Sequence, residues 1–461
     1  MIQTLPYKRS PVVALICFWL AWPRVAGAAE QYTLAEPPAP TRIETVEIRF
    51  DVSGTAEFAI EKGKLLAHPL SAQATLKYRE RRLPGAGRDA EALRGLRYYD
   101  ALETRIRVAD HATSGRLADD RRLLVAEGRR EGIFFYSPQG PLTAGDLELL
   151  RAPADSLSLL GLLPPKPVAI GEKWTVPSWV GQMLTDTEAA SKADLNCTLA
   201  SVDDGQARVT FEGTVEGATG GSSGKVGLHG SYFFDIKAQR LARAEMEQTE
   251  ERSVGPASPG MKVTAKAVVI RTPAADASGL SEETAAAVPL EPPAALTQLY
   301  FRAPWNVEFR HDRTWYVFQQ SVQIAVLRLI EQGTFVAQCN LAPVRPANAG
   351  QHVPEEQFQN DIRTSLGSRL KSIEKAEVIP LEDHRFLYRV TAVGEANNVP
   401  ITWIYYLCAA PNGVQVSFVF AVETSLRSRL GGRDLQMLKS LRFLEAPKTP
   451  EMAAPKKTSL P

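Results

Sequence analysis

An alternation of apolar and polar residues, repeated in separate runs from Thr41 to Arg271, constrains the fold more than any other feature of this chain. It is clearest in two early runs with apolar residues at every second position, namely Val46, Ile48, Phe50 and then Ala72, Ala74, Leu76, Tyr78. Successive side chains of a strand point to opposite faces of a sheet. The pattern therefore predicts strands with one buried face and one solvated face.

Turn residues join several of these runs, which predicts an antiparallel meander. Asp203, Asp204 and Gly205 stand between two runs, and Asp-Gly readily supplies the positive φ angles of a tight hairpin. Further strands are predicted at 104–108, 133–136, 194–202, 207–215, 225–235, 240–251 and 262–271. The exception is 144–163, where leucines recur around Pro153, so we expect one or two short helices lying against the sheet.

Two segments lack the apolar residues that a packed core needs. Residues 272–297 are rich in Ala, Pro, Glu and Ser, and we predict a disordered linker there. Residues 447–461 are predicted to be a disordered tail for the same reason. The chain is therefore expected to divide into a β domain at 30–271 and a second domain at 300–445.

The second domain mixes strand and helix patterns. Its strands are predicted at 315–320, 323–330, 334–341, 386–393, 399–407 and 414–422. In the middle of the domain Pro354 begins a helix whose apolar stripe is Phe358, Ile362, Leu366, Leu370 and Ile373. A final helical region at 424–440 is interrupted by Gly431 and Gly432, so we expect it in two pieces.

The order of these elements resembles the PsbP and DcrB-like superfamily of small extracytoplasmic α/β domains. The residues that carry the resemblance are Trp315-Tyr316-Val317, Trp403-Ile404-Tyr405-Tyr406, the aromatic strand 414–420 and the closing Ser440-Leu441-Arg442-Phe443. The resemblance extends over 305–443. It implies an antiparallel sheet flanked by helices, with no shared catalytic residues, in proteins that often act as accessory or assembly factors.

The first domain has a weaker resemblance. Pro167-Val168 and Gly171-Glu172-Lys173-Trp174 are similar to a segment of uncharacterised secreted bacterial β proteins, which implies nothing about activity. The expected fold class is therefore α+β, with a mainly antiparallel β domain at the N-terminus and an antiparallel sheet flanked by helices at the C-terminus.

The first residues predict export. Lys8 and Arg9 precede a short apolar run, and Ala26 and Ala28 form a cleavage pattern of small residues. We expect a signal peptide at 1–28 and a periplasmic or secreted protein, with no transmembrane segment after its removal. Lys and Arg total 53 against 52 for Asp and Glu, and this balance argues against a nucleic-acid partner.

Inspection in context leaves no catalytic, cofactor-binding or metal-binding motif. Gly220, Ser222 and Gly224 match the G-x-S-x-G pattern of hydrolases, but no helical stripe follows, so we predict a flexible hairpin loop. The 6 histidines are scattered, which favours surface or turn positions over a zinc site. The arginine-rich stretch 79–130 also carries acids, and it predicts a solvated, charge-compensated face.

Three cysteines remain after signal removal, Cys197, Cys339 and Cys408. Cys339 and Cys408 fall near the ends of two strands of the second domain, in a compartment that permits disulfides. A bridge between them requires Cα atoms roughly 4.4–6.8 Å apart. The sequence does not define the order of the strands, so a disulfide and buried reduced cysteines both stay open.

The resulting hypothesis is a non-enzymatic, secreted or periplasmic binding or assembly protein of the bacterial cell envelope, without a cofactor and with an unknown envelope partner. The alternative is a carrier that holds an apolar ligand or lipid between the curved sheet of the first domain and the leucine-rich segment 147–163. A lined apolar pocket of several hundred Å³ distinguishes the carrier, because an interaction module can be filled by its own side chains.

Overall fold

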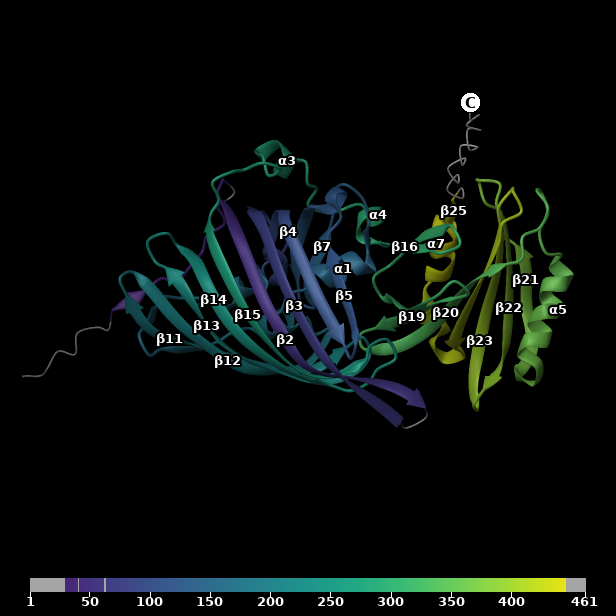
Figure 1. Cartoon of the computed structure of the whole chain (residues 1–461), viewed down its shortest axis with the longest axis horizontal. Coiled ribbons are helices and arrows are strands. Elements are labelled where there is room, and N and C mark those ends of the chain that lie inside the picture. Colours follow the sequence, from purple (N-terminus) through teal and green to yellow (C-terminus); the bar gives the residue numbers. More distant parts are fainter. Residues whose placement is uncertain (1–29, 40, 62–63, 445–461) are drawn as a thin grey trace, which may run out of the picture.

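Long antiparallel strands dominate the fold, in a 12-stranded sheet and a separate 7-stranded sheet (Figure 1). The structure is a computed structural model that describes residues 30–39, 41–61 and 64–444. The predicted signal peptide at 1–28 and the predicted tail at 447–461 lie outside these residues. Within the described ranges, no helix is both long enough and apolar enough to cross a bilayer.

The 12-stranded sheet forms the first half of the chain. Its strands are β2 (Ile43–Glu61), β3 (Lys64–Leu83), β4 (Arg94–Val108), β5 (His111–Arg116), β6 (Leu123–Arg129), β7 (Gly132–Tyr136), β10 (Lys173–Thr175), β11 (Ala189–Asp203), β12 (Gln206–Thr219), β13 (Ser222–Asp235), β14 (Arg240–Arg252) and β15 (Gly260–Pro273). Most sheet neighbours are consecutive along the chain, which confirms the predicted meander. The long-range exception is β15, which pairs with β2.

The turn predicted between β11 and β12 is confirmed. Asp204 and Gly205 connect the two strands with φ angles of 49° and 75°. Two consecutive positive φ values match the right-handed twist of the flanking strands, and Asp-Gly accepts them at low cost.

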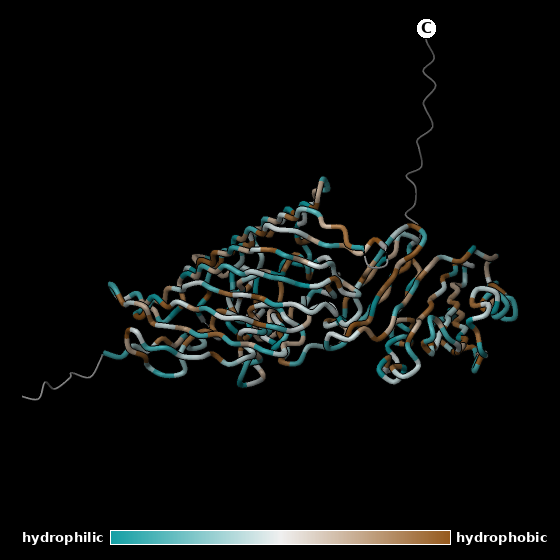
Figure 2. The backbone as a smooth tube through the Cα atoms, turned by 90° about the horizontal axis from the view of Figure 1, so that it is seen from below, coloured by the Kyte–Doolittle hydropathy of each residue, from teal (hydrophilic) through white to brown (hydrophobic). Residues whose placement is uncertain are grey.

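One face of this sheet, here called the inner face, carries the larger core of the protein. The residues of the predicted alternation confirm this, because Val46, Ile48, Leu76 and Tyr78 are all buried there. Figure 2 shows both apolar and polar residues along the long strands, as expected for strands with one buried face and one solvated face.

Three short helical elements pack on the inner face. They are α1 (Ala144–Leu150), the 3-10 helix η3 (Ser158–Leu162) and α2 (Ser178–Thr185). The first two confirm the short helices predicted at 144–163. Thr143 begins α1 with a capping box, because its hydroxyl accepts from the Asp146 amide while the Asp146 carboxylate accepts from the Thr143 amide.

The segment predicted to be a disordered linker, 272–297, has definite structure. It contains the end of β15 and the short helices α3 (Glu282–Ala286) and α4 (Ala294–Thr297). Its few apolar residues suffice because they enter one cluster on the outer face, the opposite face of the same sheet, where Leu280 is fully buried against Leu96 and Tyr136. The division into two independently folding domains stays a prediction.

The second half of the chain forms the 7-stranded sheet, in the order β18 (Trp315–Gln320), β19 (Ala325–Glu331), β20 (Thr334–Val344), β24 (Gln415–Glu423), β23 (Val399–Ala409), β22 (Phe386–Ala396) and β21 (Leu370–Val378). Helix α5 (Glu355–Leu366) covers one face (Figure 1). Two further helices, α6 (Arg427–Leu430) and α7 (Arg433–Ser440), confirm the two predicted pieces.

Short strands complete the packing between the halves. β16 (Leu299–Ala303) pairs with β17 (Val307–His311) on one side and with β8 (Leu142–Thr143) on the other. β25 (Arg442–Phe443) extends the same small sheet beyond β17. Near the N-terminus, β1 (Gln31–Tyr32) pairs with β9 (Val168–Ala169).

The predicted fold class, α+β with a C-terminal sheet flanked by helices, is wrong because the chain is predominantly β. The longest described helix, α5, has only 12 residues and ends at Leu366, so Leu370 and Ile373 of the predicted helical stripe lie in β21. Gly367, with a φ of 54°, ends the helix. The apolar spacing continues across this turn, which is why the stripe resembles one longer helix.

The β2–β3 hairpin projects beyond the rest of the large sheet (Figure 1). Pairing of β2 with β15 stops at Glu57, and pairing of β3 with β4 stops at Leu70. Beyond these points the two strands pair only with each other, yet the ribbon exposes large apolar side chains: Phe58 (37%), Ile60 (57%), Leu65 (56%) and Leu66 (42%).

A buried ion cluster holds the N-terminal segment on the sheet. The two terminal nitrogens of the Arg271 guanidinium donate to the Glu36 carboxylate, at 2.6 and 2.8 Å. The Glu44 carboxylate lies 2.6 Å from the same guanidinium. Burial would raise the pKa of Glu36, but the charge and hydrogen bonds of Arg271 outweigh it, so this pKa lies below its ordinary value.

We predict that Glu36→Gln destabilises the protein at neutral pH by about 3 kcal/mol, because it leaves Arg271 without its main counter-charge. A lowered folded-state pKa contributes stability above the unfolded-state pKa, and this stability is lost as the pH falls through the folded-state value. The difference in unfolding free energy between wild type and variant should therefore shrink as the pH falls below about 4.5. Urea unfolding at several pH values tests this, and a constant difference contradicts it.

Candidate functional site

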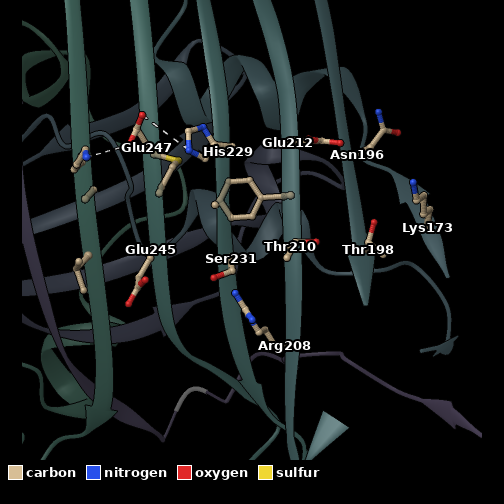
Figure 3. Close-up of a pocket in the computed structure, with 16 residues that line it drawn as sticks. Lys173, Asn196, Thr198, Arg208, Thr210, Glu212, His229, Ser231, Glu245 and Glu247 are labelled. Carbon is tan, nitrogen blue, oxygen red and sulfur yellow. Dashed lines mark ion pairs between the residues drawn. The ribbon is translucent and has the colours of Figure 1, made fainter. Parts of the chain in front are cut away.

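One hollow lies on the outer face of β10–β15 and has a volume of about 590 Å³ (Figure 3). Its cations and anions alternate across neighbouring strands, and some pair directly, as Lys266 and Glu247 do at 3.3 Å. His229 lies 4.0 Å from the same carboxylate. The hollow is open and its charges compensate one another, so its geometry is that of a solvated sheet face.

The second hollow lies on the inner face, between the sheet and the segment that contains α1 and η3, and has a volume of about 350 Å³. This volume falls at the small end of the roughly 300–1,000 Å³ range of small-molecule pockets. We call it the inner pocket. Its position agrees with the site that the sequence predicts for a carrier, between the curved sheet and 147–163.

Small and medium apolar side chains form the sheet side of the inner pocket. They come from three strands, β13, β15 and β2, and comprise Val226, Met261, Val263, Ala265, Phe50 and Val52. The opposite side comes from Leu150 to Pro153, after α1, and from Met183 and Leu184 of α2. The pocket is therefore a gap between two layers that elsewhere pack directly.

A buried ion network fixes the segment that forms the pocket's roof. The Arg97 guanidinium, fully buried on β4, donates to both oxygens of Asp155 at 2.7 Å and to Glu80 on β3 at 2.7 Å. Ser156 joins the network through its hydroxyl, which lies 2.9 Å from the hydroxyl of Tyr78. This network ties the chain between α1 and η3 to the middle of the inner face, and Asp155 is itself part of the pocket wall.

One strand brings polar side chains into the pocket. Gln248, Glu250 and Arg252 occupy alternate positions of β14 and line the pocket from its inner face. Among the described residues, the Gln248 Oε1 and the Arg252 Nε are buried without a hydrogen-bond partner. Arg252 forms one ion pair, with Glu250 at 3.4 Å.

The C-terminal half contacts the chain next to the pocket. Tyr316 of β18 donates to Glu188, the residue that follows the pocket-lining Thr187, and Arg328 of β19 donates to the carbonyl of Pro256. Burial raises the pKa of Glu188. These contacts place the 7-stranded sheet at one end of the inner pocket.

Of the two alternatives left open for Cys339 and Cys408, the structure has the buried, unbridged cysteines, because all three described cysteines are free and buried. Cys339 on β20 pairs with Phe420 of β24, whereas Cys408 on β23 pairs with Val416 of the same strand. A whole strand thus separates the two cysteines, about 10 Å at the usual spacing, which exceeds the reach of a disulfide. Burial raises the pKa of the Cys197 and Cys408 thiols to about 12, so both are unreactive.

The hairpin predicted around Ser222 is confirmed, but this serine does not lie in its loop. Gly220 and Gly221 form the turn, and Ser222 is the first residue of β13. It is 1% exposed, and its hydroxyl lies 2.7 Å from that of Ser258. No described histidine or acid bonds to it, so the arrangement that activates a serine nucleophile is not formed among the described residues.

Two further interpretations from the sequence need correction. His311 is not a surface or turn histidine, because it is buried on β17, and burial lowers its pKa. The arginine-rich stretch is not uniformly solvated either, since Arg81, Arg94 and Arg97 are all buried. The sequence gives no sign of this, because the acids that compensate Arg97 lie 17 and 58 residues away from it.

No protein-family model matches this chain, and no curated protein matches it. Solved structures align with parts of it. One is the cyanobacterial PsbP of Synechocystis sp. PCC 6803, with 10% identity and a TM-score of 0.25 over 32% of this chain and 92% of that chain. A protein of unknown function from Pseudomonas aeruginosa has 9% identity and a TM-score of 0.23, over 32% of this chain and 98% of that chain.

A third alignment is with lipovitellin, at 9% identity and a TM-score of 0.31, over 53% of this chain but only 27% of the lipovitellin chain. The resemblance of the first domain to secreted bacterial β proteins has no counterpart in these comparisons. With TM-scores below 0.5, none of the alignments implies a ligand, a partner or an activity.

We predict that Arg97→Met lowers the free energy of unfolding by about 3–5 kcal/mol, because Glu80 and Asp155 then stay buried without a counter-charge. The matched control is Arg243→Met on the outer face of β14, where the arginine pairs with Glu245 at 2.6 Å and its side chain is 45% exposed. The control substitution should lower the free energy of unfolding by about 1 kcal/mol or less. Urea unfolding of both variants at pH 7 measures the difference, and equal losses would show that the buried network is not what holds the roof.

Proposed function

We propose that this protein is an exported, non-enzymatic carrier that binds the apolar part of a small ligand or lipid in the inner pocket. The observation that carries the proposal is the gap between the inner face and the roof segment, because a sheet that served only as a scaffold would be filled there by its own side chains.

The composition of the pocket supports an elongated apolar ligand. On β15 and β2, two neighbouring strands of its sheet side, valine, alanine, methionine and phenylalanine side chains present a continuous apolar surface. Burial of apolar surface contributes about 25 cal/mol per Å², so even one alkyl chain gains several kcal/mol by entering. The small volume favours one chain over the two chains of a phospholipid.

Export is part of the proposal, and it rests on the signal-peptide pattern at 1–28. A carrier outside the cytoplasm meets apolar molecules that cannot cross an aqueous compartment unaided. The buried Ser222, which bonds only to another serine hydroxyl, and the buried thiols described above give no support to a catalytic role.

A second candidate is the binding or assembly role that the sequence first suggests. It is favoured by the apolar ribbon at the end of β2–β3, where Phe58 and Leu66 form an exposed cross-strand pair. Exposed apolar clusters of this kind mark interaction sites in soluble proteins. The two roles are compatible, because the ribbon and the inner pocket share strand β2.

For the carrier role, we predict that the neutral fluorescent probe N-phenyl-1-naphthylamine binds the purified protein and gains fluorescence. Val263→Trp fills the inner pocket from β15 and should weaken binding at least tenfold. The matched control is Lys262→Trp, which adds the same side chain on the exposed outer face of the same strand. Similar probe affinities for the two variants would contradict a site in this pocket.

For the binding role, we predict that Phe58→Ser combined with Leu66→Ser leaves the unfolding free energy within about 0.5 kcal/mol of wild type, since both side chains are exposed. Probe binding should also be unchanged. An envelope protein that copurifies with exported wild type should be lost from this variant. Identical copurifying proteins for both would remove the ribbon as an interaction site.

A further inference from the structure

We infer that the inner pocket selects an amphiphile whose neutral head group both donates and accepts hydrogen bonds, and that Gln248 and Arg252 bind this head group. A hydroxyl beside an ester carbonyl, as in a monoacylglycerol, has the required chemistry. The inference rests on the proposed carrier function and names the ligand class of the same pocket.

The first observation is the isolation of Gln248. This residue is 9% exposed, and its register neighbours, Leu228 on β13 and Ala265 on β15, are buried and apolar. No described group bonds its Oε1. A buried amide that has no partner destabilises a fold, and a ligand group that supplies the partner recovers the lost free energy on binding.

The second observation is the unused hydrogen-bonding capacity of Arg252. It lies four positions further along β14 on the same face, and its side chain is 11% exposed. Its Nε has no hydrogen-bond partner among the described residues, although the same atom forms an ion pair with the Glu250 carboxylate at 3.4 Å. Arginine presents N–H donors in a fixed fork, so a carbonyl oxygen of the ligand fits here.

The charges of the pocket select against an anionic head group. Each cation in its wall already faces an acid, since Arg252 pairs with Glu250 at 3.4 Å and Arg151 pairs with Asp186 at 3.1 Å. A carboxylate or phosphate placed between Gln248 and Arg252 meets the negative charge of Glu250. A neutral head group avoids this repulsion and still satisfies both residues.

The residues around the polar stripe, which consists of Gln248, Glu250 and Arg252, define how the ligand is oriented in the pocket. On β15, Val263 pairs with Glu250 and Met261 pairs with Arg252, so apolar side chains flank the stripe on the side of β2. Phe50 and Val52 of β2 continue this apolar surface. The head group therefore lies over β14, and the alkyl chain extends across β15 toward β2.

The test compares three ligands that share one twelve-carbon chain and differ in the head group. Monolaurin donates and accepts, methyl laurate only accepts, and laurate is anionic at pH 7.5. Each displaces N-phenyl-1-naphthylamine from the wild-type protein in a fluorescence titration. We expect monolaurin to bind more tightly than methyl laurate by roughly fivefold, which is one neutral hydrogen bond, and laurate to bind most weakly.

Substitutions of Gln248 and Arg252 test which residue binds which part of the head group. Gln248→Leu should abolish the advantage of monolaurin over methyl laurate and should leave the midpoint of urea unfolding unchanged or higher, because it removes an unsatisfied buried amide. Arg252→Met should weaken binding of both esters. The control is Glu251→Leu, at an exposed outer-face position between Gln248 and Arg252. It should leave the affinity for both esters unchanged.

The outcomes separate this inference from the carrier proposal. If the probe itself does not bind wild type, the carrier function is wrong. If the probe binds but laurate displaces it as well as monolaurin does, or Gln248→Leu keeps the preference for monolaurin, the head-group assignment is overturned while the carrier function stands. A large loss of stability in Gln248→Leu would likewise show that Gln248 serves the fold and not the ligand.

Discussion

The inner pocket depends on one buried ion network, formed by Arg97, Asp155 and Glu80. The network ties the roof segment to β3 and β4, and the hydroxyl of Tyr232 adds a hydrogen bond from β13 to the carbonyl of Leu162. Because the fork of Arg97 bonds both Asp155 oxygens, it defines the position and orientation of this segment as well as its presence. Such a pair is weak evidence of stability, but it gives the fold one specific arrangement.

The local choice of side chains explains why the gap opens where it does. At the other end of the same inner face, Phe211, Tyr232 and Phe234 are large and fully packed. At the pocket, Val263 and Ala265 leave space that the roof does not fill. The pairing of β14 with β15 and of β15 with β2 is regular, so the site arises from side-chain volume and from the polar side chains of β14.

The local elements were predictable from sequence because alternation and turn chemistry act over a few residues. Val46 and Ile48 identify their buried face, and Asp204 and Gly205 identify their turn. The fold class of the second half of the chain was not predictable, because the spacing of apolar residues continues across Gly367 from a helix into a strand. The ordered structure of residues 272–297 was not predicted either, since a few apolar residues such as Leu280 suffice when they pack into an apolar cluster of the sheet.

The candidate site was predictable only in outline. The leucines of 147–163 place a helical segment against the sheet, but the residues that give the pocket its chemistry look ordinary in sequence. Gln248 and Arg252 lie in a strand whose outer positions are equally polar, so alternation alone makes β14 polar on both faces. Only the tertiary fold turns one of these faces inward. A buried polar atom without a hydrogen-bond partner, such as the Gln248 Oε1, is the feature that separates a ligand site from a solvated strand.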